Sequence, residues 1–119
     1  MEQRQHLRVP VGISTLIYRR ALPIATGVVL NASRCGAFLG TECLDFHQHQ
    51  QLQFEFCLSG ERAGSRHRVT AHVLRRTREG VALEIDEADS ASVLAIGALL
   101  GAYALTDGAT LQGGTAPVS

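Results

Sequence analysis

The chain has 119 residues, which suffices for one domain with a single hydrophobic core. Hydrophobic residues make up 45% of it, and because it has no Trp, 4 Phe and 2 Tyr, the core must be mostly aliphatic. Basic and acidic residues number 11 each, so the formal net charge is zero. This balance argues against a dedicated duplex-DNA binder that relies on many phosphate contacts.

All of the basic residues are Arg. Genomic base composition explains this bias without any function, whereas the functional alternative is that some guanidinium groups bind guanine edges or phosphate oxygens. An odd number of cysteines predicts reduced thiols. No secretory signal opens the chain, and the longest uncharged apolar run, residues 90–106, is interrupted by two Gly and is short for a membrane span. We therefore expect a cytoplasmic protein without membrane insertion.

The first elements in chain order are an arm and three strands. Residues 1–8 are polar and carry no core pattern, so we expect a flexible N-terminal arm. Residues 9–18 and 22–30 are rich in β-forming residues and are separated by the turn-like sequence Arg-Arg-Ala. A short strand is expected at residues 36–40, between glycines.

Three further segments alternate between apolar and polar residues, which is the pattern of half-buried strands. They are residues 52–58, 69–74 and 81–86, separated by a polar loop at 59–65 and a turn at 77–80. Six short strands without a helix between them predict an all-β fold, an antiparallel barrel or a sandwich. Closing the sheet into a barrel would remove the exposed edges of such short strands.

One helix is expected after the strands. Asp89 is suited to be its N-cap, and apolar residues recur at helical spacing at Val93, Ile96, Leu100 and Tyr103. Ala, Leu and Gly fill most other positions, so the helix is apolar almost all round. One face would cover the open end of the barrel and the other needs a second partner, which makes a homodimer through this helix one expectation.

The sequence lacks the usual marks of an enzyme or a metal protein. It has no Gly-rich phosphate loop, no zinc-finger spacing of cysteines and no nucleophile with a positioned base. His47 and His49 would share one face of a strand, but further ligands are not apparent, and two solvated histidines are the simpler interpretation. We expect no enzymatic activity, no metal and no cofactor.

Two motifs remain as candidates for ligand binding. The arm carries Arg4 and Arg8 in an RxxxR spacing, and two guanidinium groups there can offer paired donors to guanine or phosphate oxygens. The same spacing recurs by chance at Arg62 and Arg66, so it is weakly specific alone.

The second motif, [D/N]xSxxG, is formed by Asn31, Ser33 and Gly36 at a strand end. Short polar side chains beside a glycine can approach a ligand closely, but the alternative is a tight turn that binds nothing.

Together, an RxxxR arm before the first strand, an [D/N]xSxxG spacing about two strands later, and six strands followed by a helix resemble the PilZ domain family. The resemblance extends from about Arg4 to Tyr103. It implies a six-stranded antiparallel β-barrel, of the split-barrel type, with one C-terminal α-helix. It also implies a bacterial receptor for cyclic di-GMP, a cyclic dinucleotide with two guanines and two phosphates.

The resemblance assigns a role to each motif residue. It implies that Arg4 and Arg8 hold guanine and phosphate, that Asn31 and Ser33 bind a guanine edge, and that Gly36 keeps the wall of the site open.

Arg34, inside the second motif, is a further candidate contact that the pattern does not require. Many relatives have another Arg where this chain has Gln3, which implies lower affinity or a different stoichiometry. The expected organisation is an arm at 1–8, a barrel with its helix at 9–106 and a disordered tail at 107–119.

We expect ligand binding to order the arm and to create a surface for an unidentified effector protein. The alternative is a constitutive protein–protein interaction module that docks through the apolar helix and binds no nucleotide. Binding of single-stranded RNA or DNA is disfavoured by the zero net charge and by few aromatic side chains for stacking.

Overall fold

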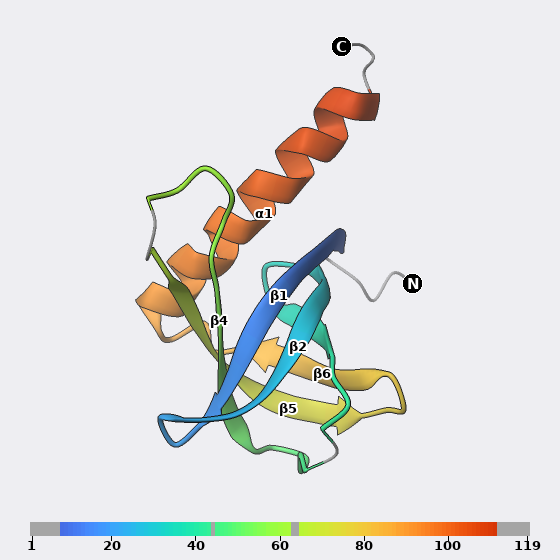
Figure 1. The fold of residues 1–119 in the computed structure, drawn as a ribbon, viewed down its shortest axis with the longest axis vertical. Coiled ribbons are helices and arrows are strands. Elements are labelled where there is room, and N and C mark those ends of the chain that lie inside the picture. The colour runs from blue at the N-terminus through green and yellow to red at the C-terminus, as the bar shows by residue number, and fades with distance from the viewer. Residues whose placement is uncertain (1–7, 44, 63–64, 112–119) are drawn as a thin grey trace.

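The computed structural model describes residues 8–43, 45–62 and 65–111, and the side chains up to residue 104 (Figure 1). Within these ranges the chain forms six strands and one helix. They are β1 (Val9–Arg19), β2 (Leu22–Ala32), β3 (Gly36–Gly40), β4 (Gln51–Phe56), β5 (His67–Arg76), β6 (Gly80–Ile85) and α1 (Ser90–Leu111). Each expected strand and the expected helix is present, with shifts of a few residues at the ends.

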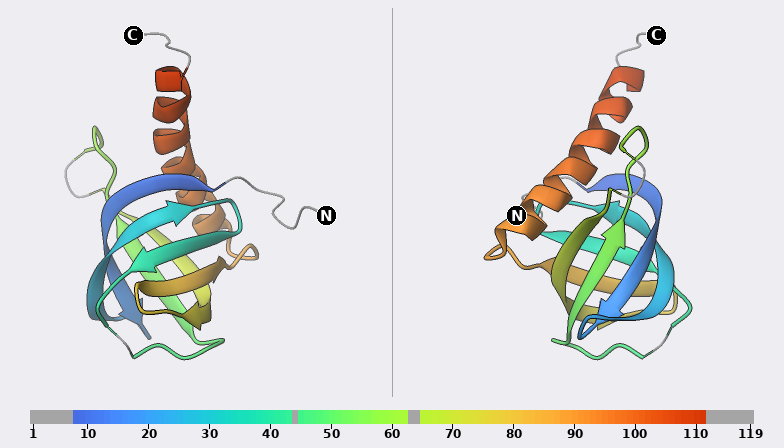
Figure 2. Two further views of the ribbon diagram at one scale, coloured as in Figure 1. Left: turned by 90° about the vertical axis from the view of Figure 1, so that its right-hand side faces the viewer. Right: turned by 60° about the vertical axis from the view of Figure 1, so that its left-hand side comes forward.

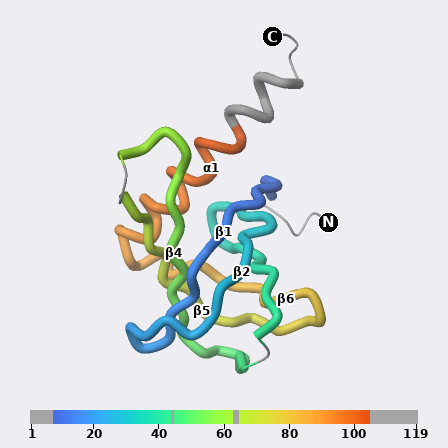
Figure 3. The backbone as a smooth tube through the Cα atoms, viewed as in Figure 1, coloured from blue at the N-terminus to red at the C-terminus, as the bar shows by residue number. Residues whose placement is uncertain are grey.

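The strands form a closed antiparallel barrel in the order β1-β2-β3-β6-β5-β4 (Figure 2). The barrel is closed by three pairs between β1 and β4, of which Ile17 opposite Phe54 is the central one. The backbone trace in Figure 3 follows the strands around the barrel, including the connection from β3 to β4, which are not neighbours in the sheet. The expected all-β barrel with a C-terminal helix is confirmed, and the sandwich alternative is wrong.

The core is built from the inward positions of the alternating strands. Ile17, Val29, Leu39, Phe54 and Val69 are each 0% exposed. Burial of these aliphatic and aromatic side chains is the main favourable contribution to folding.

The helix begins after Asp89, whose carbonyl accepts a hydrogen bond from Val93 N–H at 3.1 Å. The Asp89 carboxylate also accepts one from the Ser92 hydroxyl at 2.6 Å, in agreement with its expected role as N-cap. Ser92 is fully buried, and its oxygen accepts the Thr70 N–H of β5 at 2.7 Å. Ser92, which is polar and therefore not part of the apolar helical pattern, joins the helix to the barrel.

The buried face of α1 is defined by Ala95, Ile96 and Leu99, which belong to the barrel core. Leu100 and Tyr103 pack at its margin, but Val93 is 43% exposed and does not belong to it. The helix contacts β5 and β1, and its C-terminal end points away from the barrel (Figure 1). In the described part of the chain no helix meets the length and hydropathy needed to cross a membrane.

The helix continues to Leu111 and so includes the first five residues of the tail that was expected at 107–119. Residues 107–111 are helical because adding a residue to an existing helix gains a backbone hydrogen bond without a new nucleation step. Residues 112–119 of the expected tail, and residues 1–7 of the expected arm, lie outside the described residues.

Candidate functional site

The two sequence motifs meet where β1 begins and β2 ends. Antiparallel pairing places Val9 opposite Ala32 and Pro10 opposite Asn31. Arg8 immediately precedes β1, and its Nη1 donates a hydrogen bond to Asn31 Oδ1 at 2.9 Å. The β1–β2 ladder therefore brings together an arginine and an amide that are 23 residues apart in the chain.

A β-bulge sets the direction of the Asn31 side chain. The register between β2 and β3 shifts between Val29 and Asn31, so that Asn31 lies opposite Phe38. Phe38 is on the outward face of β3, because its neighbours Ala37 and Leu39 are buried in the core. Opposite residues of a ladder share a face, so the bulge turns Asn31 to the outside of the barrel.

Ser33 holds the turn between β2 and β3. Its N–H donates to the Gly36 carbonyl at 2.8 Å, and its Oγ accepts the N–H groups of Cys35 at 3.3 Å and Gly36 at 3.2 Å. The residue is 3% exposed. The motif therefore does form a tight turn, with the serine as its central acceptor.

Gly36 forms the floor below the Arg8 guanidinium. A Cβ atom added at Gly36 would lie 3.1 Å from the Leu83 carbonyl oxygen and 3.6 Å from Arg8 Nη2. Any larger side chain would enter the space that the guanidinium covers. Because it has no side chain, the buried glycine lets the guanidinium lie close over the strand backbone, between Ser33 and β6.

Two arginines, Arg34 and Arg4, are the remaining predicted site residues. Arg34 is exposed at the tip of the turn, and within the described residues no hydrogen bond or ion pair is assigned to it. Arg4 lies outside the described residues. The structure therefore brings together Arg8, Asn31, Ser33 and Gly36, and shows Arg34 within the same turn.

The sheet adds Glu84 to this region, a residue that the motif spacing could not reveal. Glu84 of β6 is the direct partner of Gly36. It is exposed, whereas Leu83 and Ile85 on either side are buried. The alternating pattern predicts that Glu84 is on the wet face of its strand, but its place beside Gly36 follows from the order of strands in the barrel.

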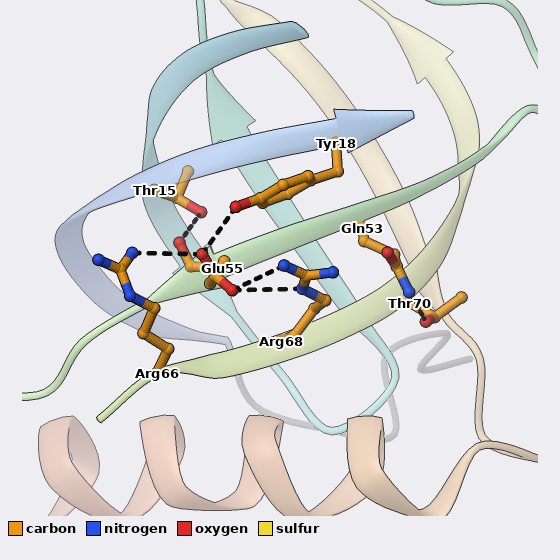
Figure 4. Close-up of polar contacts among 7 residues, drawn as sticks. All are labelled: Thr15, Tyr18, Gln53, Glu55, Arg66, Arg68 and Thr70. Carbon is orange, nitrogen blue, oxygen red and sulfur yellow. Dashed lines mark hydrogen bonds and ion pairs between the residues drawn. The ribbon is translucent and has the colours of Figure 1, made fainter. Parts of the chain in front are cut away.

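A separate polar network centres on Glu55 of β4 (Figure 4). Its side chain is 8% exposed and accepts hydrogen bonds from Tyr18 Oη at 3.0 Å, Arg66 Nη1 at 3.3 Å and Arg68 Nη2 at 2.9 Å. The Arg68 guanidinium also lies 4.1 Å from the centre of the Tyr18 ring. Burial alone would raise the pKa of Glu55, but the hydrogen bonds from Arg68 and Tyr18 and the two arginine charges outweigh it and hold that pKa below its ordinary value of 4.5.

We expect Glu55→Gln to lower the free energy of unfolding at pH 7 by about 1–3 kcal/mol, because charge-assisted hydrogen bonds to a buried acceptor are lost. A carboxyl with a lowered pKa in the folded state stabilises the protein above its unfolded pKa and loses that contribution as the pH falls through the folded pKa. The difference between wild type and variant should therefore shrink below about pH 4.5.

Urea denaturation from pH 7 to pH 3, followed by circular dichroism, measures this difference. Glu87→Gln makes the same change at an exposed position and should stay close to wild type throughout. A Glu55→Gln deficit that is equally large at pH 3 and pH 7 would contradict the assignment.

A hollow lies at the other end of β1. It is open to solvent, has a volume of about 910 Å³ and is lined by residues that include Arg19, Asp45, His47 and Gln53. Arg19 pairs with Asp45 there at 3.0 Å. None of the described motif residues lines this hollow.

Comparison with known proteins gives one family. Residues 2–102 match the family model of the PilZ domain. Among solved structures, the PilZ domain of CeSA from a cellulose-synthesizing bacterium superimposes with a TM-score of 0.67 at 16% identity, covering 80% of this chain and 96% of that one. The Bacillus subtilis inhibitor of motility (MotI/DgrA) superimposes with a TM-score of 0.62 at 20% identity, covering 81% of this chain and 48% of that one. No curated protein matches the sequence significantly.

Proposed function

Because the chain belongs to the PilZ domain family, whose members are generally receptor or adaptor domains and not enzymes, we propose that it is a receptor for cyclic di-GMP. One observation carries the proposal. The Arg8 guanidinium donates a hydrogen bond to Asn31 and lies over the buried backbone of Gly36, so Arg8 of the first motif is held against two residues of the second.

The chemistry of these groups suits an anionic dinucleotide. A guanidinium has five N–H donors, and Arg8 donates one of those on Nη1 to Asn31. Its other N–H groups can donate in pairs to phosphate or guanine oxygens. The amide nitrogen of Asn31 remains as a donor for a base edge. In the proposal, Arg4 supplies a second guanidinium, Ser33 contributes to a guanine edge and Gly36 lets the ligand approach the backbone. Arg34, exposed in the same turn, is a further candidate contact.

We propose that the ligand acts by ordering residues 1–8 over this surface. Fixing a segment of chain has an entropic cost, which charge-assisted bonds between the arginines and the two phosphates would offset. The ordered segment then forms a new surface for an unidentified effector protein. A bacterial cytoplasm, where cyclic di-GMP acts, is the setting that this function implies.

An interaction module that binds no nucleotide is the second candidate, and exposed apolar residues on α1 favour it. Leu94 is 73% exposed and Val93 is 43% exposed. A Cβ at either Gly97 or Gly101 would have no atom within 4 Å, so this helix face is open in the described structure. A homodimer through α1, or docking of α1 on an effector, would cover these side chains.

Titration of the full chain with cyclic di-GMP separates the two candidates. Calorimetry should show saturable binding, and amides of residues 1–8 should gain protection from hydrogen exchange when the ligand is added. A folded protein that binds no cyclic di-GMP would contradict the receptor and favour the interaction module. Binding without any added protection of residues 1–8 would contradict the ordering mechanism alone.

A further inference from the structure

Glu84 and Arg8 are both next to Gly36 on the outer face of the barrel. Glu84 lies directly opposite Gly36 in the β3–β6 ladder, and directly opposite residues project from the same face of a sheet. The Arg8 guanidinium lies 3.6 Å from the position that a Gly36 Cβ would take. Gly36 itself is buried, whereas Arg8 and Glu84 are exposed. A ligand that binds the Arg8 guanidinium on the outer face therefore has the Glu84 carboxylate in the neighbouring position of the sheet.

The Glu84 carboxylate is available as an acceptor. The residue is exposed, and no hydrogen bond or ion pair is assigned to it among the residues that the structure describes. Its other ladder neighbour is His72 of β5, which is half-buried. Both carboxylate oxygens can thus accept donors from a ligand on the outer face of the barrel.

The surface beside Glu84 suits a planar ring. Phe38 lies opposite Ala82 in the next outward position along the same two strands. Ala82 is buried at 8% exposed and Phe38 is half-buried, so the apolar surface next to the carboxylate comes from the Phe38 ring. An apolar floor with polar groups at its margin is the usual arrangement for holding a base.

On the premise of the proposed receptor function, we infer that Glu84 reads guanine, its carboxylate accepting the N1–H and the exocyclic N2–H of one base of cyclic di-GMP. Two parallel donors on the base match the two oxygens of a carboxylate. Adenine presents a lone pair at N1 and has no 2-amino group, so the same carboxylate disfavours it. Glu84 is then a specificity residue that lies outside both sequence motifs.

Whether Glu84→Gln weakens or tightens ligand binding tests this role. A carboxylate that merely lies near two phosphates would repel the ligand, and removing its charge would tighten binding. A carboxylate that accepts two guanine donors makes the opposite prediction, since Gln offers one acceptor oxygen and places an N–H₂ group against the second donor. Glu84→Gln should therefore weaken cyclic di-GMP binding by about 10- to 50-fold.

The experiment is calorimetry with cyclic di-GMP and with cyclic di-IMP, the analogue that lacks the exocyclic 2-amino groups. Wild type should bind the guanine ligand roughly 10-fold more tightly than the inosine one, and Glu84→Gln should lose most of that preference. Glu42→Gln removes the same charge at an exposed position beyond the other end of β3 and should bind as wild type does. Circular dichroism checks that each variant is folded.

The outcomes are distinguishable. If wild type binds cyclic di-GMP and Glu84→Gln binds it equally or more tightly, Glu84 does not read guanine, although the receptor function stands. If Glu84→Gln binds more weakly but keeps the full preference for cyclic di-GMP, the carboxylate does not contact the 2-amino group and the inference fails. If folded wild type binds neither ligand, the receptor function and the role of Glu84 fail together.

Discussion

Arg8→Ala should weaken cyclic di-GMP binding by about 100-fold, because it removes the paired donors that the guanidinium offers to the ligand. Arg8 is exposed, and its side-chain hydrogen bond within the described residues is to Asn31 at 2.9 Å, so its loss should leave the barrel folded. Isothermal titration calorimetry of wild type and variant measures the difference in affinity, and circular dichroism verifies the fold. Arg8→Lys keeps the charge without the planar fork and should recover a small part of the affinity.

The control for Arg8→Ala is Arg62→Ala. Arg62 and Arg66 repeat the RxxxR spacing in the loop between β4 and β5, and Arg62 is exposed. Both substitutions lower the net charge by one, so a general electrostatic attraction between protein and ligand would change equally in the two variants. Equal affinities of Arg8→Ala and Arg62→Ala would contradict a specific role for Arg8.

The barrel was predictable from sequence because each strand carries its own signal. The alternation from Leu52 to Phe56 in β4 needs no knowledge of the neighbouring strands, and burial of one face is enough to produce it. The short β3 is recognisable from its flanking glycines, Gly36 and Gly40. Strand order, in contrast, depends on which edges pair, and it was not predicted, because the family resemblance supplied only the barrel and its helix.

The site was less predictable, because its geometry arises from pairing between strands. Asn31 reaches the outer face through a bulge in β2, and no local pattern marks that bulge. Glu84 lies beside Gly36 because β6 pairs with β3, although the two residues are 48 positions apart. Ser92 breaks the apolar pattern of α1 and is nevertheless buried, because it accepts the Thr70 N–H at the end of the β5–β6 pairing. Each of these roles requires a partner that is distant in the chain.

The stability of the barrel that positions this site should depend strongly on Phe54. The side chain is 0% exposed and belongs to β4, where Phe54 is paired with both Ile17 of β1 and Val69 of β5, at the seam that closes the barrel. Its ring centre also lies 6.1 Å from that of Phe56. Phe54→Ala should lower the free energy of unfolding by about 3–5 kcal/mol, because it loses buried apolar area and leaves a cavity that the ladder cannot close.

Urea denaturation followed by circular dichroism measures this loss as a lower midpoint with an unchanged slope. Leu22→Ala is the control, because Leu22 is 65% exposed and its truncation should change stability by less than about 0.5 kcal/mol. The free energy of unfolding of a small domain is about 5–15 kcal/mol in total, so Phe54→Ala could unfold the protein. Phe54→Leu provides a milder variant, whose free energy of unfolding should fall by about 1–2 kcal/mol. If Phe54→Ala and Leu22→Ala unfold at the same urea concentration, the pairing of β1 with β4 does not hold the barrel closed, and the site around Gly36 must be stabilised by the other strand pairs.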